Sequence, residues 1–374
     1  MSSVSLFEPI TLGPLTLANR VVLSPMTRAR ATADYTPTDM MVEYYRQRAS
    51  AGLIISEGTF VSPTGTGWNH CGGLFEDAHV DGWRNVTDAV HRQGGRIVCQ
   101  LWHTGRVTAA SQVPEGRTLS SVSHQPPDSV VAHTGNGGEE TPAAEAAGMT
   151  ADDMTREIER FATATAMARD AGFDGVELHA ANGYLIDQFL RDSVNSRDDE
   201  YGGSPENRVR FPAAVVEAIV GAWAAERVGV RVSPVGVYNA MEDSDPTATF
   251  SAFIDRLNDA GVCFLDVVEP PNPFDAENPG VGRPEVCNVL RERFAGAYIA
   301  NGGYDRTAAD AVLEANMADL VAFGRPFIAN PDLPFRLQTA APLAEGDHAK
   351  NYGGDAEGYI DYPTLASEQS PATA

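Results

Sequence analysis

The sequence predicts an α/β fold, a (β/α)8 TIM barrel in which eight parallel strands each precede a helix. Short β-branched runs alternate with longer helical patterns along most of the 374 residues, and this length suits one barrel with insertions. No G-x-G-x-x-G motif follows an early strand, which disfavours the main alternative, a doubly wound sheet. We therefore expect residues 1–374 to form a single barrel domain that ends in a disordered tail at 364–374.

Eight β-branched runs are expected to be the barrel strands. They cover residues 20–23, 53–56, 96–101, 175–179, 228–232, 263–268, 297–300 and 320–323. Helical patterns cover residues 39–49, 80–93, 151–171, 206–225, 247–260 and 306–316. Ser204 precedes a proline at a helix start, and Asp153 and Thr155 are capping candidates for the helix over 151–171. Gly172 and Gly261 are expected to end two helices, because glycine tolerates left-handed backbone.

The segment 104–150, after the third strand, interrupts this alternation. It is rich in Ser, Pro, Gly and Glu and has no sustained apolar period. Loops of this length in compact folds are often functional lids. We expect a partly ordered lid over the top of the barrel, with disorder as the alternative.

The charge balance excludes several kinds of partner. Lys and Arg number 27 against 51 Asp and Glu, a formal charge of −24. Such a surface repels nucleic acid and anionic lipid, so neither partner is expected. The sequence has no apolar run of membrane-spanning length and no signal-peptide pattern at its start. We expect a cytoplasmic protein, either a monomer or a homodimer.

The four cysteines are Cys71, Cys99, Cys263 and Cys287, and no two form a C-x-x-C pair. Metal and iron–sulfur sites need clustered thiolates, so no metal is expected. The cysteines are expected to be buried, unpaired thiols in a reducing compartment.

The active site of such a barrel gathers at the carboxyl ends of its strands. The residues there are Thr27, Gly58, Gln100, Trp102, His179, Arg231, Asn301 and Arg325. No pair of carboxylates converges among them, which disfavours glycoside hydrolysis. The sequence also lacks a G-x-S-x-G elbow, which disfavours acyl transfer by that route.

The last two strand ends indicate a phosphate site. Strand seven runs into Gly302 and Gly303, and strand eight runs into Gly324 and Arg325. Glycines let backbone N–H groups approach an anion, and an arginine adds two parallel hydrogen bonds. Barrels commonly bind phosphate in these two loops, so a phosphorylated cofactor or substrate is expected.

The fourth strand ends in polar residues suited to catalysis. His179 and Asn182 could both donate to one substrate oxygen and polarise a conjugated carbonyl or nitro group. Tyr184 could supply a proton as a general acid.

At these residues the chain resembles a known family along nearly its whole length. The matching segments are residues 6–9, 19–20, 24–28, 43–49, 56–58, 100–103, 179–184, 188–190, 195–204, 206–208, 324–328 and 358–363. The most specific are His179-Ala180-Ala181-Asn182-Gly183-Tyr184 and Asn195-Ser196-Arg197-Asp198-Asp199-Glu200-Tyr201-Gly202-Gly203-Ser204. The chain is similar to the Old Yellow Enzyme family of FMN-dependent ene-reductases, in the branch with Thr27 in place of a cysteine.

The resemblance implies FMN as the cofactor. Backbone groups around Pro25, Met26 and Gly58 would line the flavin ring. Thr27 would hydrogen-bond the flavin carbonyl O4, and Gln100 would bind the pyrimidine edge.

The same resemblance implies how the charged parts of FMN would be held. Arg231 would lie near N1 and stabilise the negative charge of the reduced flavin. Gly302, Gly303, Gly324 and Arg325 would hold the phosphate.

The resemblance also implies the reaction. NADPH or NADH would reduce FMN, and an enone, enal, maleimide or nitroalkene would then take the same site in a ping-pong cycle. Flavin N5 would deliver hydride, and Tyr184 would protonate the other alkene carbon. His179 and Asn182 would anchor the substrate oxygen, while Trp102 and Tyr352 would wall the pocket.

Three alternatives stay open. The first is a nitroester or nitroaromatic reductase on the same scaffold. The second is a flavin-free barrel lyase or isomerase that acts on a phosphorylated substrate. The third is a non-catalytic flavin-binding protein, which would not need Tyr184. Asn182 stands where other family members have a second His, so substrate preference is expected to differ while activity survives.

Overall fold

The computed structural model describes residues 4–113, 120–126, 128–134, 139–271 and 282–368. Its central feature is a ring of eight parallel strands, in the order β3, β4, β6, β11, β12, β13, β14 and β15, with β15 paired to β3. These strands are β3 (Val21–Leu23), β4 (Leu53–Ile55), β6 (Ile97–Trp102), β11 (Gly175–Ala180), β12 (Val228–Val232), β13 (Phe264–Val268), β14 (Ala297–Asn301) and β15 (Leu320–Phe323). The short strand β5 (Thr59–Phe60) adds to the edge of β6. The predicted closed (β/α)8 barrel is confirmed.

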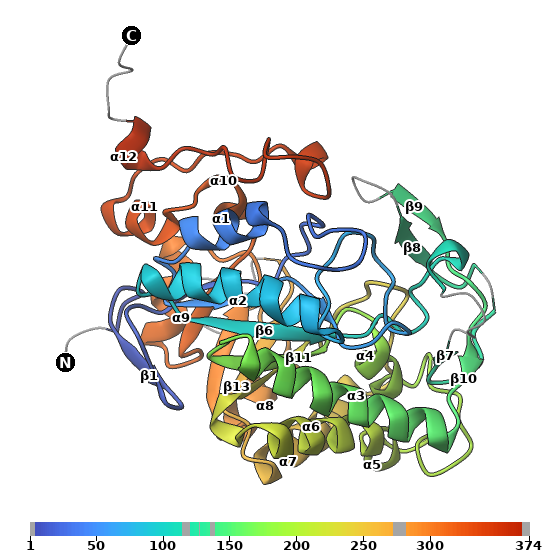
Figure 1. Ribbon diagram of the computed structural model, residues 1–374. Helices are drawn as coiled ribbons and strands as arrows, with labels where there is room; N and C mark the ends of the chain where they lie inside the picture. Colours follow the sequence, from blue (N-terminus) through green and yellow to red (C-terminus); the bar gives the residue numbers. More distant parts are fainter. Residues whose placement is uncertain (1–3, 114–119, 127, 135–138, 272–281, 369–374) are drawn as a thin grey trace.

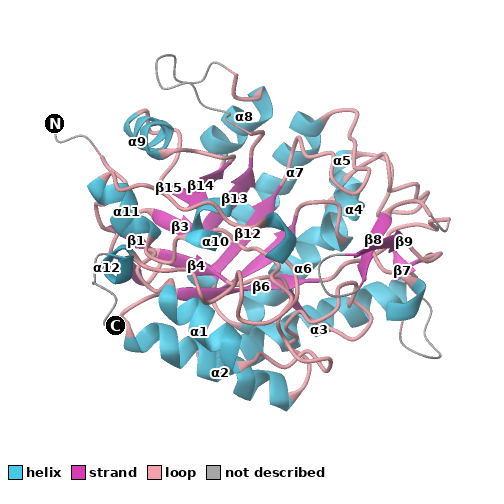
Figure 2. Ribbon diagram, turned by 90° about the horizontal axis from the view of Figure 1, so that it is seen from above, coloured by secondary structure: helices cyan, strands magenta, loops and turns pink. Residues whose placement is uncertain are grey.

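The helices lie around the outside of this ring, except for α10 (Arg325–Ala329), which lies over it (Figure 2). They are α1 (Asp39–Gln47), α2 (Asp77–Arg92), α3 (Ala151–Asp170), α4 (Leu185–Leu190), α5 (Pro205–Arg208), α6 (Arg210–Ala222), α7 (Pro246–Asp259), α8 (Glu285–Arg293), α9 (Arg306–Glu314), α10 (Arg325–Ala329), α11 (Leu333–Thr339) and α12 (Leu365–Glu368). Short 3-10 turns are η1 (Ala110–Gln112), η2 (Ala225–Arg227) and η3 (His348–Lys350).

The helix ends correct some predictions. The helix expected over 206–225 is divided into α5 and α6, and α8 was not predicted. The N-cap of α3 is Thr150, whose side chain accepts from the backbone N–H of Asp153 while the Asp153 carboxylate accepts from that of Thr150. This capping box uses Asp153 at the third helical position and leaves Thr155 inside the helix. Gly172 and Gly261 end α3 and α7 with φ of +86° and +71°, as predicted.

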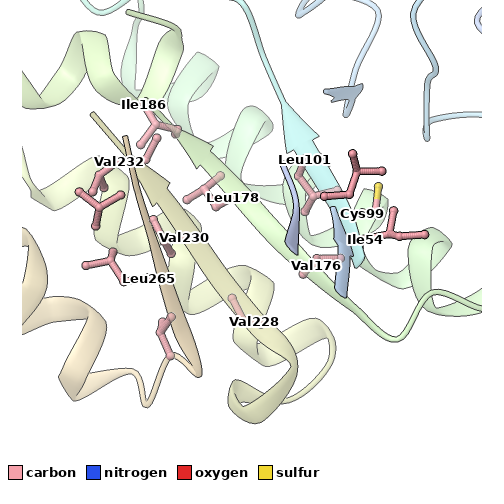
Figure 3. Packing of buried hydrophobic residues seen from close by; sticks show 14 of the residues in the cluster. Ile54, Cys99, Leu101, Val176, Leu178, Ile186, Val228, Val230, Val232 and Leu265 are labelled. Carbon is pink, nitrogen blue, oxygen red and sulfur yellow. The ribbon is translucent and has the colours of Figure 1, made fainter. Parts of the chain in front are cut away.

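Alternation along the strands separates two apolar layers. The outward side chains pack against the helices. Figure 3 shows part of this layer, with Ile54, Cys99, Leu101, Val176, Leu178, Val228, Val230, Val232 and Leu265 from the strands and Ile186 from α4.

The inward side chains fill the barrel itself. The inner cluster contains Val22, Leu53, Ile55, Val98, Phe264, Ile299, Leu320 and Ala322, joined by Leu12 and Leu17. The last two come from the antiparallel hairpin of β1 (Ile10–Leu12) and β2 (Leu15–Leu17), which packs at the end where the strands begin. A Cβ at Gly229 would lie 2.0 Å from the Phe264 ring, so glycine makes room for this ring. These side chains and the hairpin therefore fill the barrel interior at this end.

The insertion between β6 and α3 contains four short strands. They are β7 (Ser120–Ser121), β8 (Val131–Thr134), β9 (Glu139–Pro142) and β10 (Ala147–Gly148). β8 and β9 form an antiparallel hairpin that projects at one edge of the molecule (Figure 1). The insertion predicted after the third barrel strand is therefore present.

The rest of the chain bears on two further expectations. The expected tail at 364–374 begins with the short helix α12, and residues 369–374 lie outside the described residues. Within the described ranges, none of the helices combines the length and the apolar character needed to cross a membrane.

Candidate active site

A cavity of about 670 Å³ opens where the barrel strands end. All fifteen side chains or glycines predicted for the site line it. They are Pro25, Met26, Thr27, Gly58, Gln100, Trp102, His179, Asn182, Tyr184, Arg231, Gly302, Gly303, Gly324, Arg325 and Tyr352. The sequence therefore predicted the composition of this cavity, while the individual roles stay predictions.

Arg231 is fixed at the floor of the cavity. One guanidinium nitrogen pairs with Asp266, and the other donates to the Asn301 side chain over 3.0 Å. The Asn301 amide in turn donates to the Ala322 carbonyl oxygen over 2.9 Å. These bonds come from neighbouring strands, so the barrel register itself sets the position of this cation.

Gln100 is held from below by a second buried acid. Its amide nitrogen donates to Glu177 over 2.8 Å, which leaves the Gln100 carbonyl oxygen for the cavity. Burial, and then the charge of Asp266, raises the pKa of Glu177 well above its usual range. Glu177 and Asp266 each keep one buried oxygen without a hydrogen-bond partner. The floor is therefore strongly polar and suited to a polar ring edge.

His179 is a neutral donor. The backbone N–H of Ala181 donates to Nδ1 over 3.3 Å, so the ring proton resides on Nε2. Burial, and then the charge of Arg231, lowers the pKa of His179 well below its usual range. The ring therefore donates one hydrogen bond without carrying a charge at neutral pH.

Asn182 and Tyr184 complete the group. Asn182 has a φ of +58°, a left-handed conformation that asparagine tolerates. Its backbone N–H donates to Ser233 Oγ over 2.8 Å. The Tyr184 ring lies edge-on to Trp102 and His179, with centroids 4.9 and 5.1 Å away. Burial is the main factor that raises the pKa of Tyr184, so its hydroxyl keeps its proton at neutral pH.

The opposite end of the cavity is suited to an anion. Gly303 has a φ of +79°, and Gly324 precedes the first residue of α10. The Arg325 side chain is exposed, and no bond ties it to another part of the chain that the structure describes. Its guanidinium is therefore free to meet a phosphate.

Gly58 lets the cavity wall approach closely. A Cβ there would lie 2.5 Å from the Trp102 ring, and Trp102 itself stacks on Phe60 with centroids 4.9 Å apart. Any larger residue at 58 would displace this indole.

Sequence reasoning missed Trp68 and Tyr238, which also line the cavity. The Trp68 ring stacks on His133 of β8 at 4.1 Å and lies 5.2 Å from Tyr352. The Tyr238 hydroxyl lies 3.0 Å from His133 Nε2, and burial raises the pKa of this phenol to about 12. Neither residue directly follows a strand. The one sequence signal for a place at the cavity is that each is a large aromatic residue in a loop that contains Gly and Asn.

A metal centre has no support from the geometry. Among the described residues, no three His, Cys, Asp or Glu side chains are placed to share an ion. The four cysteines are free.

Comparison with known proteins identifies the family. Residues 5–344 match the sequence model of the NADH:flavin oxidoreductase / NADH oxidase family. The chain belongs to this family. It is 40% identical to a "probable flavin mononucleotide-dependent alkene reductase" of Leishmania infantum over 96% of this chain and 97% of the other.

Solved structures of this flavin oxidoreductase family agree. The old yellow enzyme homologue from Zymomonas mobilis superimposes with a TM-score of 0.90 at 41% identity, over 97% of this chain and 100% of the other. Morphinone reductase in complex with tetrahydroNAD gives a TM-score of 0.90 at 41% identity, over 98% and 99%. The predicted resemblance to the Old Yellow Enzyme family is confirmed.

Membership makes the protein an oxidoreductase that uses FMN and a nicotinamide hydride donor. The cavity fits this cofactor, because its lining combines the Gln100 amide and the Arg231 guanidinium at one end with turn glycines and the Arg325 side chain at the other. The flavin-free lyase considered above is overturned by the same membership.

Proposed function

We propose that this protein reduces the C=C bond of an enone, enal, maleimide or nitroalkene at the expense of NADH or NADPH. The observation that carries the proposal is the grouping of His179, Asn182 and Tyr184 at one cavity in the described part of the chain. Two neutral donors and a protonated phenol suit a substrate with an electron-withdrawing oxygen and a carbon that must be protonated.

The three polar residues have different roles in the proposed reaction. His179 and Asn182 hydrogen-bond the substrate oxygen and polarise the conjugated double bond. Tyr184 gives its hydroxyl proton to the alkene carbon next to that activating group. The hydride would come from bound FMN, with the nicotinamide as its source. The nicotinamide and the alkene use the cavity in turn, as in a ping-pong cycle.

The FMN site is proposed on the same cavity. Pro25, Met26, Thr27 and Gly58 would line the flavin ring, and Gln100 would bind its pyrimidine edge.

Two arginines would hold the charged parts of FMN. Arg231 would stabilise the negative charge of the reduced ring. Gly302, Gly303, Gly324 and Arg325 would hold the phosphate.

The insertion at 104–150 is proposed to act as a lid. His133 of its β8–β9 hairpin stacks on Trp68 and hydrogen-bonds Tyr238, and both of these residues line the cavity. Trp102 and Tyr352 form the side walls. A lid of this kind would keep water from the reacting atoms.

The test uses purified, FMN-saturated protein without oxygen. NADH or NADPH should bleach the flavin absorbance, and cyclohexenone should restore it with one equivalent of cyclohexanone formed. A flavin that the nicotinamides leave oxidised would contradict the oxidoreductase cycle. Restoration by nitrate esters or nitroaromatics, with none by enones or nitroalkenes, would favour the nitro-reductase alternative.

A further inference from the structure

Glu269 lies just after β13, and its backbone and side chain bond β14, the turn after β14 and Arg283 before α8. The residue is 4% exposed, with its side chain fully buried, and it borders the cavity. Its carboxylate accepts hydrogen bonds from the Arg283 guanidinium, with Nε at 2.9 Å, and from the hydroxyls of Tyr298 and Tyr304 at 2.8 and 2.5 Å. With two nitrogens from Arg283, four donor atoms therefore meet on one buried carboxylate. The reaction proposed above gives none of these residues a role.

Three of the bonds made by Glu269 go to one short segment, residues 298–304. Tyr298 and Tyr304 at its two ends donate to the carboxylate. In the middle, the backbone N–H of Glu269 donates to the Asn301 carbonyl oxygen over 2.7 Å. The segment includes Gly302 and Gly303, and a left-handed residue such as Gly303 depends on its surroundings to fix its backbone.

Burial and the charge of Glu269 together keep the phenols of Tyr298 and Tyr304 protonated. Arg283 and Glu269 are fully buried as an ion pair, and the guanidinium lies 5.0 Å from the Tyr298 ring. Burial, and then the charge of Glu269, raises the pKa of both Tyr298 and Tyr304. The two phenols therefore stay protonated and can only donate to this carboxylate.

We propose that Glu269 is a positioning residue for the turn at Gly302–Gly303, and that it thereby determines how strongly the protein prefers FMN to riboflavin. The inference rests on the proposed phosphate site at Gly302 and Gly303. Riboflavin has the same ring as FMN but no phosphate, so a residue that acts only through this turn affects the retention of FMN and spares that of riboflavin.

The Glu269→Gln substitution isolates the acceptor role. It keeps the size of the side chain but turns one oxygen into an NH2 group, which cannot accept a hydrogen bond. Whichever way the amide is turned, either Tyr304, or Tyr298 with Arg283, loses its buried acceptor. A buried donor without an acceptor is unfavourable enough to shift the turn.

The experiment starts from the holoenzyme. Protein loaded with FMN, and the same protein exchanged with excess riboflavin, are diluted, and flavin release is followed by the recovery of flavin fluorescence. Glu269→Gln should release FMN about tenfold faster or more and riboflavin within about twofold of the wild-type rate. Equal acceleration of both flavins, or no acceleration of FMN, would overturn the inference.

Glu157→Gln is the matched control. Glu157 is also a buried carboxylate, 3% exposed, with donors from Ser62, Thr64 and Arg160, but it does not border the cavity. Its FMN-to-riboflavin ratio of release rates should match the wild type. A change as large as that of Glu269→Gln would mean that any buried carboxylate has this effect, and the inference would fail.

Two further variants keep the test decisive. If Glu269→Gln does not fold or does not retain flavin, Tyr304→Phe removes one donor and should raise the FMN release rate about threefold while sparing riboflavin; an unchanged rate would overturn the inference. Arg325→Ala tests the phosphate site separately. Faster FMN release in Arg325→Ala with none in Glu269→Gln refutes only the role of Glu269, whereas no effect in Arg325→Ala refutes the phosphate site itself.

Discussion

Replacing Tyr184 by Phe tests the proton donor directly. The substitution keeps the ring, and with it the edge-on contacts to Trp102 and His179, so the free energy of unfolding should change by only about 1 kcal/mol. Loss of a general acid typically costs a factor of about 100 to 10,000. We expect a loss near the lower limit, about 100-fold or ~2.7 kcal/mol in the barrier, because the phenols of Tyr238 and Tyr352 border the same cavity and could deliver a proton through water.

Stopped-flow absorbance separates the two halves of the cycle. Flavin bleaching by NADH should proceed at the wild-type rate in the Phe variant, because hydride transfer to the cofactor does not use the hydroxyl. Restoration of absorbance by cyclohexenone should slow by the factor above. Reoxidation within about threefold of wild type, with bleaching unchanged, would refute the assignment of Tyr184 as the acid.

Three further outcomes are expected from the same cavity and its surroundings. Arg325→Ala should retain FMN at least about tenfold less well, so the protein should lose its yellow colour on gel filtration; retention of colour would count against the phosphate site. His179 has a pKa below that of an unfolded histidine, so the unfolded state binds more protons and stability falls as pH drops below about 6.5. The melting temperature should therefore fall less between pH 7 and pH 5 in His179→Asn than in wild type, and parallel curves would contradict this. Cys263 is the only partly exposed thiol of the four, and burial and then Glu226 raise its pKa to about 11; a thiol reagent at pH 8 should modify it first and slowly, as mass spectrometry of peptides would show.

The parts of the fold that follow from local sequence were predicted well. Val228–Val232 is a β-branched run in which outward valines alternate with Gly229 and Arg231, and it forms β12 as expected. The end of α3 was also predictable, because Gly172 adopts a conformation that few other residues tolerate.

The errors arose where an interaction over a few residues competes with periodicity. The start of α3 at residue 151 was predicted, but its N-cap is Thr150 rather than Asp153 or Thr155, and Asp153 closes the capping box from the third helical position. Helix α8 was missed because only Val286, Cys287 and Leu290 of its nine residues are buried, which is a weak apolar period.

The cavity was predicted where strand ends carry the chemistry and was incomplete where loops bring residues together. Gln100 and Arg231 lie on strands, so their convergence follows from the barrel. Trp68 and Tyr238 line the cavity, and both contact His133, which is far from each of them in the chain. No local pattern encodes that contact, since it depends on how the insertion folds over the barrel.

The acidic chain places a few arginines at and around the cavity, although its formal net charge is −24. Only one of the 27 basic residues is a lysine. Arg231 is held by Asp266 and Asn301. It therefore offers the cavity planar donors in a fixed position more than a free positive charge. Arg28, which follows Thr27 in the chain, donates to the carbonyl oxygens of Asn351 and Gly358. These two hydrogen bonds connect the segment that carries Tyr352 to the segment that carries Thr27, across more than 300 residues. Because the surroundings of these arginines are buried, salt should screen the repulsion across the acidic surface far more than it weakens the contacts at the site.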